Sequence, residues 1–186
     1  MGSPKALLAY RGETFLGRLQ RLFLAATDPV VVVLGHDAAT VREVLDGRVI
    51  VALNDDPERG MLSSLQVGLL LIYYCGAVAP RKLKLAPQRL LFLPLDYPAI
   101  QQDTITKLCA TPLADVAMPR YQGRRGHPVL ISQKVARELL NLPPTAAARD
   151  VIRQYNDTIL YVDVDDPAIL MDVDTPEDYQ ALLSRP

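Results

Sequence analysis

Short runs of apolar residues alternate along this sequence with segments in which apolar residues recur every three or four positions. The clearest runs cover residues 30–34, 49–53 and 90–95. These runs are continuously apolar and do not alternate with polar residues, so they predict strands that are covered on both faces, as in a parallel sheet flanked by helices. Weaker strand patterns follow near 116, near 129 and at 159–162.

Apolar residues at three- and four-residue spacing predict the helices. They are expected at 15–26, around 41–45, at 62–75, 104–109, 135–140 and 146–155, and after 175. Thr14 is the expected N-cap of the first helix, and Thr175, followed by a proline, opens the last. The stretch 79–87, with three Lys or Arg and two prolines, predicts a surface loop. This alternation predicts a three-layer, Rossmann-like α/β fold with a mostly parallel central sheet, in a single domain spanning residues 1–186.

Composition removes several classes of function. The 186 residues include 20 Lys+Arg and 21 Asp+Glu, for a net charge of −1, so neither nucleic acid nor a membrane surface is expected as a partner. Cys75 and Cys109 are the only cysteines and lack a C-x-x-C spacing, which excludes a disulfide framework and a thiolate zinc site. The sequence shows neither an apolar run long enough to span a membrane nor a signal pattern, so we expect a cytoplasmic protein.

Carboxylates follow two of the apolar segments. Asp96 closes the run 90–95, while Asp172 and Asp174 follow the apolar residues 169–171, which are interpreted as a strand. Carboxylates at the carboxyl ends of two strands lie in the ligand crevice of an α/β sheet, and together they can hold Mg²⁺ against nucleotide phosphates. An Asp in either context is more often a turn former or helix cap than a metal ligand, and only the pair in matching positions makes the two interpretations equally good.

Three further segments carry groups suited to binding a ligand. Lys5, after a Gly-Ser-Pro turn, could present its ammonium to a phosphate. The segment 60–65 (GMLSSL) offers a turn and two hydroxyls at a helix start, and 123–128 (GRRGHP) places two arginines between glycines. A solvated lysine, helix capping and a solvated turn are the alternative interpretations. The sequence has neither a P-loop nor a dinucleotide-binding fingerprint.

Taken in order, these segments resemble the successive motifs of the MobA-like NTP transferases, and most closely the molybdenum cofactor cytidylyltransferase branch. The matching segments are 1–8 (MGSPKALL), 60–65 (GMLSSL), 93–98 (LPLDYP), 125–129 (RGHPV) and 172–178 (DVDTPED). The resemblance implies Mg²⁺-dependent transfer of a nucleoside monophosphate from an NTP, with CTP expected, to a phosphorylated acceptor, with molybdopterin expected. It also implies a molybdoenzyme or its chaperone as a partner. A sugar phosphate acceptor and a non-catalytic cofactor-binding homologue are the alternatives.

The resemblance also assigns roles to residues. It implies that Lys5 contacts the nucleotide phosphates and that Asp96 and Asp174 bind Mg²⁺, with Asp172 as the substitute for Asp174. The residues implied on the base and acceptor side of the pocket are Gly60, Ser63, Ser64, Gly126, His127 and Pro128. A lysine and two metal-binding carboxylates suit a reaction that needs charge neutralisation and positioning rather than a protein nucleophile.

The family's N-terminal strand and Gly-rich loop have no counterpart in this sequence, which begins at the Met-Gly segment. That strand would lie beside 30–34. We therefore expect the sheet to show a gap there, to close up, or to borrow a strand from another subunit. We also expect residues 1–8 to lie in a new place, which would leave Lys5 far from Asp96.

Overall fold

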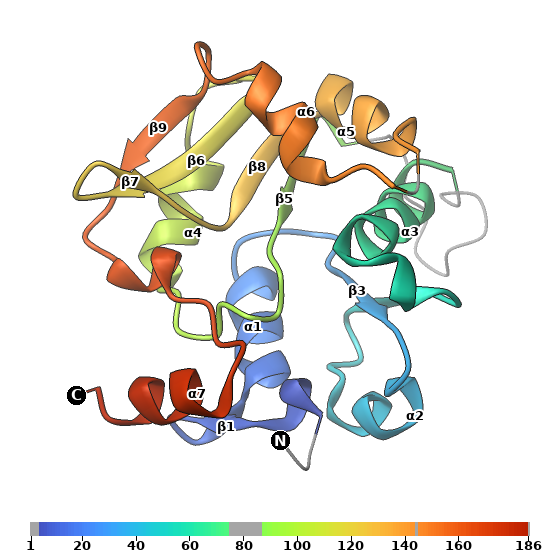
Figure 1. Ribbon diagram of the computed structural model, residues 1–186, viewed down its shortest axis with the longest axis vertical. Helices are drawn as coiled ribbons and strands as arrows, with labels where there is room; N and C mark the ends of the chain where they lie inside the picture. The colour runs from blue at the N-terminus through green and yellow to red at the C-terminus, as the bar shows by residue number, and fades with distance from the viewer. Residues whose placement is uncertain (1–3, 75–86, 144, 186) are drawn as a thin grey trace.

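The structure, a computed structural model, describes residues 4–74, 87–143 and 145–185. Its main sheet has five strands in the order β5-β8-β6-β7, with β9 paired along β6 (Figure 1). The strands are β5 (Arg89–Phe92), β6 (Val116–Tyr121), β7 (Arg124–Arg125), β8 (Val129–Ser132) and β9 (Leu160–Asp163). The apolar runs therefore predicted the positions of most of these strands, but β7 was not foreseen.

The expectation of a mostly parallel sheet is wrong for these five strands. Only β6 and β9 run parallel, whereas β5 with β8, β6 with β7 and β6 with β8 are antiparallel. The connection from β6 through β7 to β8 is too short for the crossover that parallel neighbours need. The sheet is therefore mixed.

Helices cover both faces of this sheet, so three layers are present as predicted. On one face, α3 (Met61–Tyr74), α5 (Gln133–Leu140) and α6 (Ala148–Gln154) pack against Val116, Met118 and Ile131. On the other face, α4 (Gln102–Cys109) packs through Leu108 against Ala117 and Leu130. Alternate residues of β6 and β8 thus enter separate cores, which explains why the central parts of these strands are apolar on both faces.

A second, two-stranded sheet lies apart from the first. In it β3 (Val31–Leu34) runs parallel to β4 (Ile50–Leu53), and among the described residues no strand pairing joins this pair to β5. Three outcomes were expected beside residues 30–34, and the structure shows the first of them, a gap between β3 and the main sheet. Between β3 and β4, where a helix around 41–45 was expected, the chain forms α2 (Ala38–Val41) followed by a 3-10 turn, η2 (Arg42–Val44).

The prediction of a strand at 169–171 is wrong. These residues belong to η4, a 3-10 helix (Pro167–Leu170), and the loop after it. Asp166 caps this turn, because its side chain accepts a hydrogen bond from the Ala168 N–H. Asp172 and Asp174 therefore follow a helical turn rather than a strand. The predicted loop at 79–87 lies outside the described residues except for Pro87.

The two ends of the described chain pack together. The chain begins with η1 (Lys5–Leu7) and a hairpin of β1 (Ala9–Tyr10) and β2 (Glu13–Thr14), and ends with α7 (Pro176–Leu183), which lies beside β1 (Figure 1). The Tyr179 hydroxyl donates to the Ala9 carbonyl at 2.8 Å, and the Tyr179 ring meets Phe15 edge-on. The C-terminal helix therefore holds the N-terminal segment in place.

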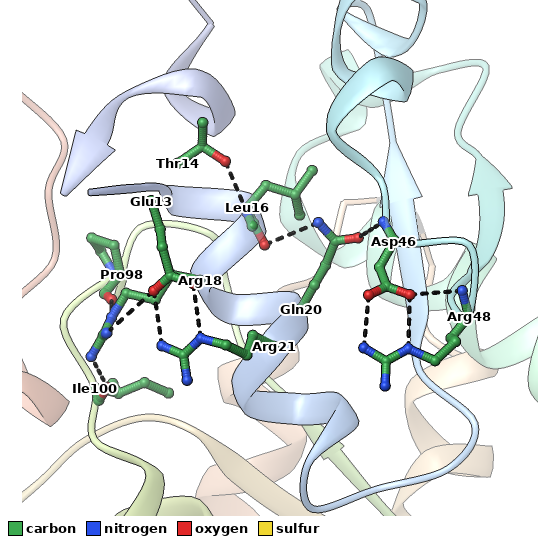
Figure 2. Close-up of polar contacts among 11 residues, drawn as sticks. Glu13, Thr14, Leu16, Arg18, Gln20, Arg21, Asp46, Arg48, Pro98 and Ile100 are labelled. Carbon is green, nitrogen blue, oxygen red and sulfur yellow. Dashed lines mark hydrogen bonds and ion pairs between the residues drawn. The ribbon is translucent and has the colours of Figure 1, made fainter. Parts of the chain in front are cut away.

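Helix α1 (Phe15–Leu24) connects the parts of the fold through polar contacts (Figure 2). Thr14 caps it as predicted, accepting from the Gly17 N–H. Gln20, which is buried, donates to the Leu16 and Val44 carbonyls and accepts from the Asp46 N–H. Every polar atom of this amide is thus paired, and α1 is tied to the loop before β4.

Candidate functional site

Lys5 joins the two predicted metal-binding carboxylates. Its ammonium nitrogen lies 2.7 Å from Asp96 Oδ1 and 2.9 Å from Asp174 Oδ1. The expectation that Lys5 lies far from Asp96 is therefore wrong. The three residues that the resemblance assigned to phosphate and metal binding form one cluster, even though 91 and 169 positions separate Lys5 from the two acids in sequence.

Backbone hydrogen bonds hold the two acidic segments side by side. The Val173 N–H donates to the Asp96 carbonyl at 2.9 Å. Asp178 accepts from the N–H groups of Asp174 and Thr175, while the Thr175 hydroxyl accepts from the Asp178 N–H and so completes a capping box. The start of α7 thus fixes the backbone that carries Asp174.

Arg18 holds the segment after Asp96 in place through hydrogen bonds. Its guanidinium donates to the Pro98 carbonyl at 2.8 Å and to the Ile100 carbonyl at 3.1 Å (Figure 2). Both carbonyls lie in the loop that leads from β5 to α4, where the sheet no longer supplies partners. Arg18 is therefore a positioning residue for Asp96 that the sequence pattern did not reveal.

The backbone beneath Lys5 is anchored by its neighbour. Ala6 is buried in a cluster with Leu16 and Leu34, and Leu95 packs against the same cluster. The segments that carry Lys5 and Asp96 therefore share one apolar support. The side chain of Asp174 is 60% exposed, so the charged cluster of Lys5, Asp96 and Asp174 is accessible to solvent.

The charges of the cluster do not cancel. Burial lowers the pKa of Lys5, but the hydrogen bonds and charges of Asp96 and Asp174 outweigh it and raise the pKa above its usual value. Lys5 is therefore a cation at neutral pH. One ammonium facing two carboxylates leaves one negative charge uncompensated, and this attracts a further cation.

His127 and Tyr97 lie next to the carboxylates. Their rings stack with centroids 4.6 Å apart. Burial lowers the pKa of His127, an effect that the charges of Asp172 and Asp96 partly oppose, so the imidazole is neutral at pH 7. Burial, followed by the nearby carboxylates, raises the pKa of Tyr97. The pair thus forms an uncharged aromatic wall beside the charged cluster.

Gly126 has a packing role in the same turn. Its N–H donates to the Pro119 carbonyl, and the next N–H, that of His127, donates to the Ile169 carbonyl, both at 3.0 Å. A Cβ on Gly126 would collide with the backbone carbonyl of Ile169. A residue without a side chain is therefore needed for η4 to lie against this turn.

The predicted serines belong to a separate polar network. The buried Asn54, directly after β4, donates to the hydroxyls of Ser63 and Ser64 at 2.8 and 3.0 Å, and its carbonyl oxygen accepts from the Asp56 N–H. The Ser63 hydroxyl also donates to the Gly60 carbonyl at 2.8 Å, which differs from helix capping, where the side chain accepts a hydrogen bond from a backbone N–H. Gly60 adopts a φ of +85°, which glycine reaches without strain. No hydrogen bond or ion pair of the described residues connects this network to Lys5, Asp96 or Asp174.

The donor set of the cluster suits a magnesium or manganese ion that also binds a nucleotide. The described residues contain no group of three or more His, Cys, Asp or Glu side chains that could enclose a metal. Two carboxylates already gathered around one cation are a common arrangement for Mg²⁺, which keeps several waters and takes its remaining oxygens from substrate phosphates. Asp96 and Asp174 thus fit such an ion.

A shallow hollow of about 380 Å³ between α1 and residues 43–48 is a weaker candidate. Arginines line it, but each already binds a carboxylate through two nitrogens, Arg21 with Glu13 and Arg48 with Asp46 (Figure 2). These arginines carry no uncompensated charge for a phosphate. The cluster around Lys5 is therefore the better candidate site.

The fold agrees with the comparisons to known proteins. The model of the MobA-like NTP transferase domain matches residues 1–159, and the chain belongs to that family. It is a nucleotidyltransferase of the MobA-like family by this assignment. No curated protein matches the chain. In the described part of the chain, helices long and apolar enough to cross a membrane are absent.

Solved structures share the fold of this chain. Rv0371c from Mycobacterium tuberculosis H37Rv is 26% identical, with a TM-score of 0.77 over 100% of this chain and 92% of that one. Its manganese complex is 28% identical, with a TM-score of 0.73 over 99% and 94% of the two chains. Molybdopterin-guanine dinucleotide biosynthesis protein A from Archaeoglobus fulgidus is 12% identical, with a TM-score of 0.61 over 98% and 90%, and shares the fold alone. The similarity therefore does not single out the molybdenum cofactor branch.

Proposed function

We propose that this protein transfers a nucleoside monophosphate from an NTP to a phosphorylated acceptor at the cluster of Lys5, Asp96 and Asp174, with Mg²⁺ as cofactor, CTP as the nucleotide and molybdopterin as the acceptor. The observation that carries the proposal is the convergence of both carboxylates on the Lys5 ammonium, which lies 2.7 Å from Asp96 Oδ1 and 2.9 Å from Asp174 Oδ1. The family assignment and the manganese complex of Rv0371c support it.

In the proposed reaction an oxygen of the acceptor phosphate attacks the α-phosphorus of the NTP, and the bond to the β-phosphate oxygen breaks to release pyrophosphate. A metal ion at Asp96 and Asp174 would neutralise charge on the phosphates. Lys5 supplies a further positive charge to the phosphate oxygens. His127 and Tyr97 form the wall that we assign to the acceptor side, and Gly60, Ser63 and Ser64 are proposed to contact the base.

The proposal is tested by measuring pyrophosphate release from CTP, GTP, ATP and UTP, each with Mg²⁺ and with molybdopterin or a sugar 1-phosphate as acceptor. We expect release with CTP and molybdopterin and its loss on addition of EDTA. Release only with the sugar phosphate would make that compound the acceptor. Nucleotide binding by calorimetry without release under any condition would instead identify a non-catalytic homologue.

Replacing His127 by Ala should separate acceptor use from nucleotide binding. His127 packs against Tyr97 beside Asp96 and makes no ion pair with Lys5. Its removal should raise the KM for the acceptor by about fivefold, which corresponds to the loss of roughly 1 kcal/mol of aromatic contact, and leave the KM for the NTP within about twofold. Steady-state kinetics with each substrate varied in turn measures both values. An equal rise in KM for both substrates, or no change in either, would favour the alternative interpretation of residues 123–128 as a solvated turn.

A further inference from the structure

Lys5 occupies the position that a metal ion would need in order to bind both carboxylates. Its nitrogen lies between Asp96 Oδ1 and Asp174 Oδ1 at 2.7 and 2.9 Å, whereas Mg²⁺ binds carboxylate oxygens at about 2.1 Å. An ammonium and a divalent cation repel each other strongly at such separations. The two cations therefore cannot share the same pair of oxygens.

We propose that Lys5 is a built-in counter-ion that a divalent cation displaces from Asp96 and Asp174, and that the released ammonium then binds the nucleotide triphosphate. This inference rests on the proposed function for the nucleotide, but not on the identity of the base or the acceptor. Lys5 then has two alternative partners, the carboxylates in the metal-free protein and the triphosphate in the metal-bound protein.

The surroundings allow the side chain to move while its backbone stays in place. Ala6 is buried beside Leu16 and Leu34, so the backbone of η1 is anchored, while the lysine side chain carries its charge on a flexible four-carbon stem. Asp174 is 60% exposed, so a hydrated cation can approach from solvent. The net negative charge that remains when Lys5 is in place favours its exchange for a divalent ion.

Displacement predicts coupled binding of metal and nucleotide. A metal that binds alone must break two charge-assisted hydrogen bonds and leave the ammonium in water. When a triphosphate is also present, its oxygens supply a new partner for Lys5. The metal should therefore bind more tightly with the nucleotide than without it, and by linkage the nucleotide should bind more tightly with the metal.

The chemical reactivity of Lys5 in the unmodified protein tests the displacement directly. The protein is treated briefly with an acetylating reagent in EDTA, with saturating Mn²⁺, and with Mn²⁺ plus CTP, and acetylation of each lysine is measured by mass spectrometry. We expect Lys5 to react several-fold faster with Mn²⁺ alone than in EDTA, and to be protected again when CTP is added. Lys107, which pairs with Asp103 on the surface of α4, is the internal reference and should not change.

A pair of variants tests the competition for the carboxylates. In the absence of nucleotide, Lys5→Met should bind Mn²⁺ at least about tenfold more tightly than the unmodified protein, measured from the electron paramagnetic resonance signal of free Mn²⁺. Arg185→Met removes one exposed positive charge from the residues after α7, whose guanidinium contacts Met171 and not the carboxylate pair. It should change Mn²⁺ affinity by less than about twofold because salt screens exposed charges. The increase in Mn²⁺ affinity caused by CTP should be smaller in Lys5→Met.

Two results would overturn the proposal. Lys5 reactivity that stays the same when Mn²⁺ is bound would show that the metal binds other carboxylate oxygens and leaves Lys5 in place. Unchanged or weaker Mn²⁺ binding by Lys5→Met would show that the ammonium does not compete. Both measurements are made without acceptor, so their failure is distinct from the absence of pyrophosphate release, which would contradict the proposed function alone.

Discussion

Replacing Asp96 by Asn is expected to reduce Mg²⁺-dependent pyrophosphate release by about 10²–10³-fold, since a metal ion that holds the phosphates contributes several kcal/mol to transition-state stabilisation. Asn keeps the shape of the side chain but removes the charge that a cation needs at this position. Asp96 Oδ1 makes the shorter of the two contacts to Lys5, 2.7 Å against 2.9 Å for Asp174. The rate constant kcat and the affinity for Mn²⁺ should fall together.

Two neighbouring variants show whether this loss is specific to the carboxylate pair. Glu177→Gln removes an exposed charge from the first turn of α7, three residues beyond Asp174, and should keep activity within about twofold. Asp172→Asn tests the substitute metal ligand. Because the ion pairs of Lys5 are with Asp96 and Asp174, we expect a smaller loss for Asp172→Asn than for Asp174→Asn. The reverse order would move the metal site to Asp172, and full activity in Asp96→Asn would remove Asp96 from the site.

Strands that lie on long, continuous apolar runs were predicted correctly from the sequence. The segments β3, β4 and β5 lie on continuous apolar runs, and most of their side chains are buried or half-buried, with Leu53 at the end of β4 the 47% exposed exception. The segment 169–171 is equally apolar but short, and it follows Asp166 and Pro167, a cap followed by a proline that favours a helical turn. The same signal at Thr175 and Pro176 predicted α7 correctly. The rule that a capping residue followed by a proline begins a helical turn identifies η4 at Asp166 as it identifies α7 at Thr175.

The direction of the strands and the composition of the site depend on contacts that local patterns do not contain. The seven residues between β6 and β8 force an antiparallel return, which composition alone does not signal. The meeting of Lys5 with Asp96 and Asp174 joins residues 91 and 169 positions apart. The family motifs assigned all three residues to one site, but the unmatched N-terminal strand led to the opposite expectation, that Lys5 lies far from Asp96. Asn54 and Arg18 carry no such motif, and their supporting roles follow from hydrogen bonds seen in the folded chain.

Substituting Ala for Gly126 is expected to lower the free energy of unfolding by about 3–4 kcal/mol, the upper range for a buried position that cannot accept added volume. A methyl group there would collide with the backbone carbonyl of Ile169, which cannot rotate away as a side chain can. The Ile169 carbonyl also accepts the hydrogen bond of the His127 N–H. Relief of the collision would therefore break this bond and move η4 away from the turn that carries His127.

Thermal unfolding measures the effect, because 1 kcal/mol corresponds to roughly 2–4 °C in Tm for a chain of this size. The Tm of Gly126→Ala should therefore fall by about 6–16 °C. Gly47→Ala is the matched control, since its new methyl group meets no atom within 4 Å and its φ lies outside the left-handed region, and it should stay within about 1 kcal/mol of the original protein. If Gly126→Ala kept its stability and lost only acceptor use, the glycine would serve the binding pocket, and the close packing of η4 against this turn would not be what requires it.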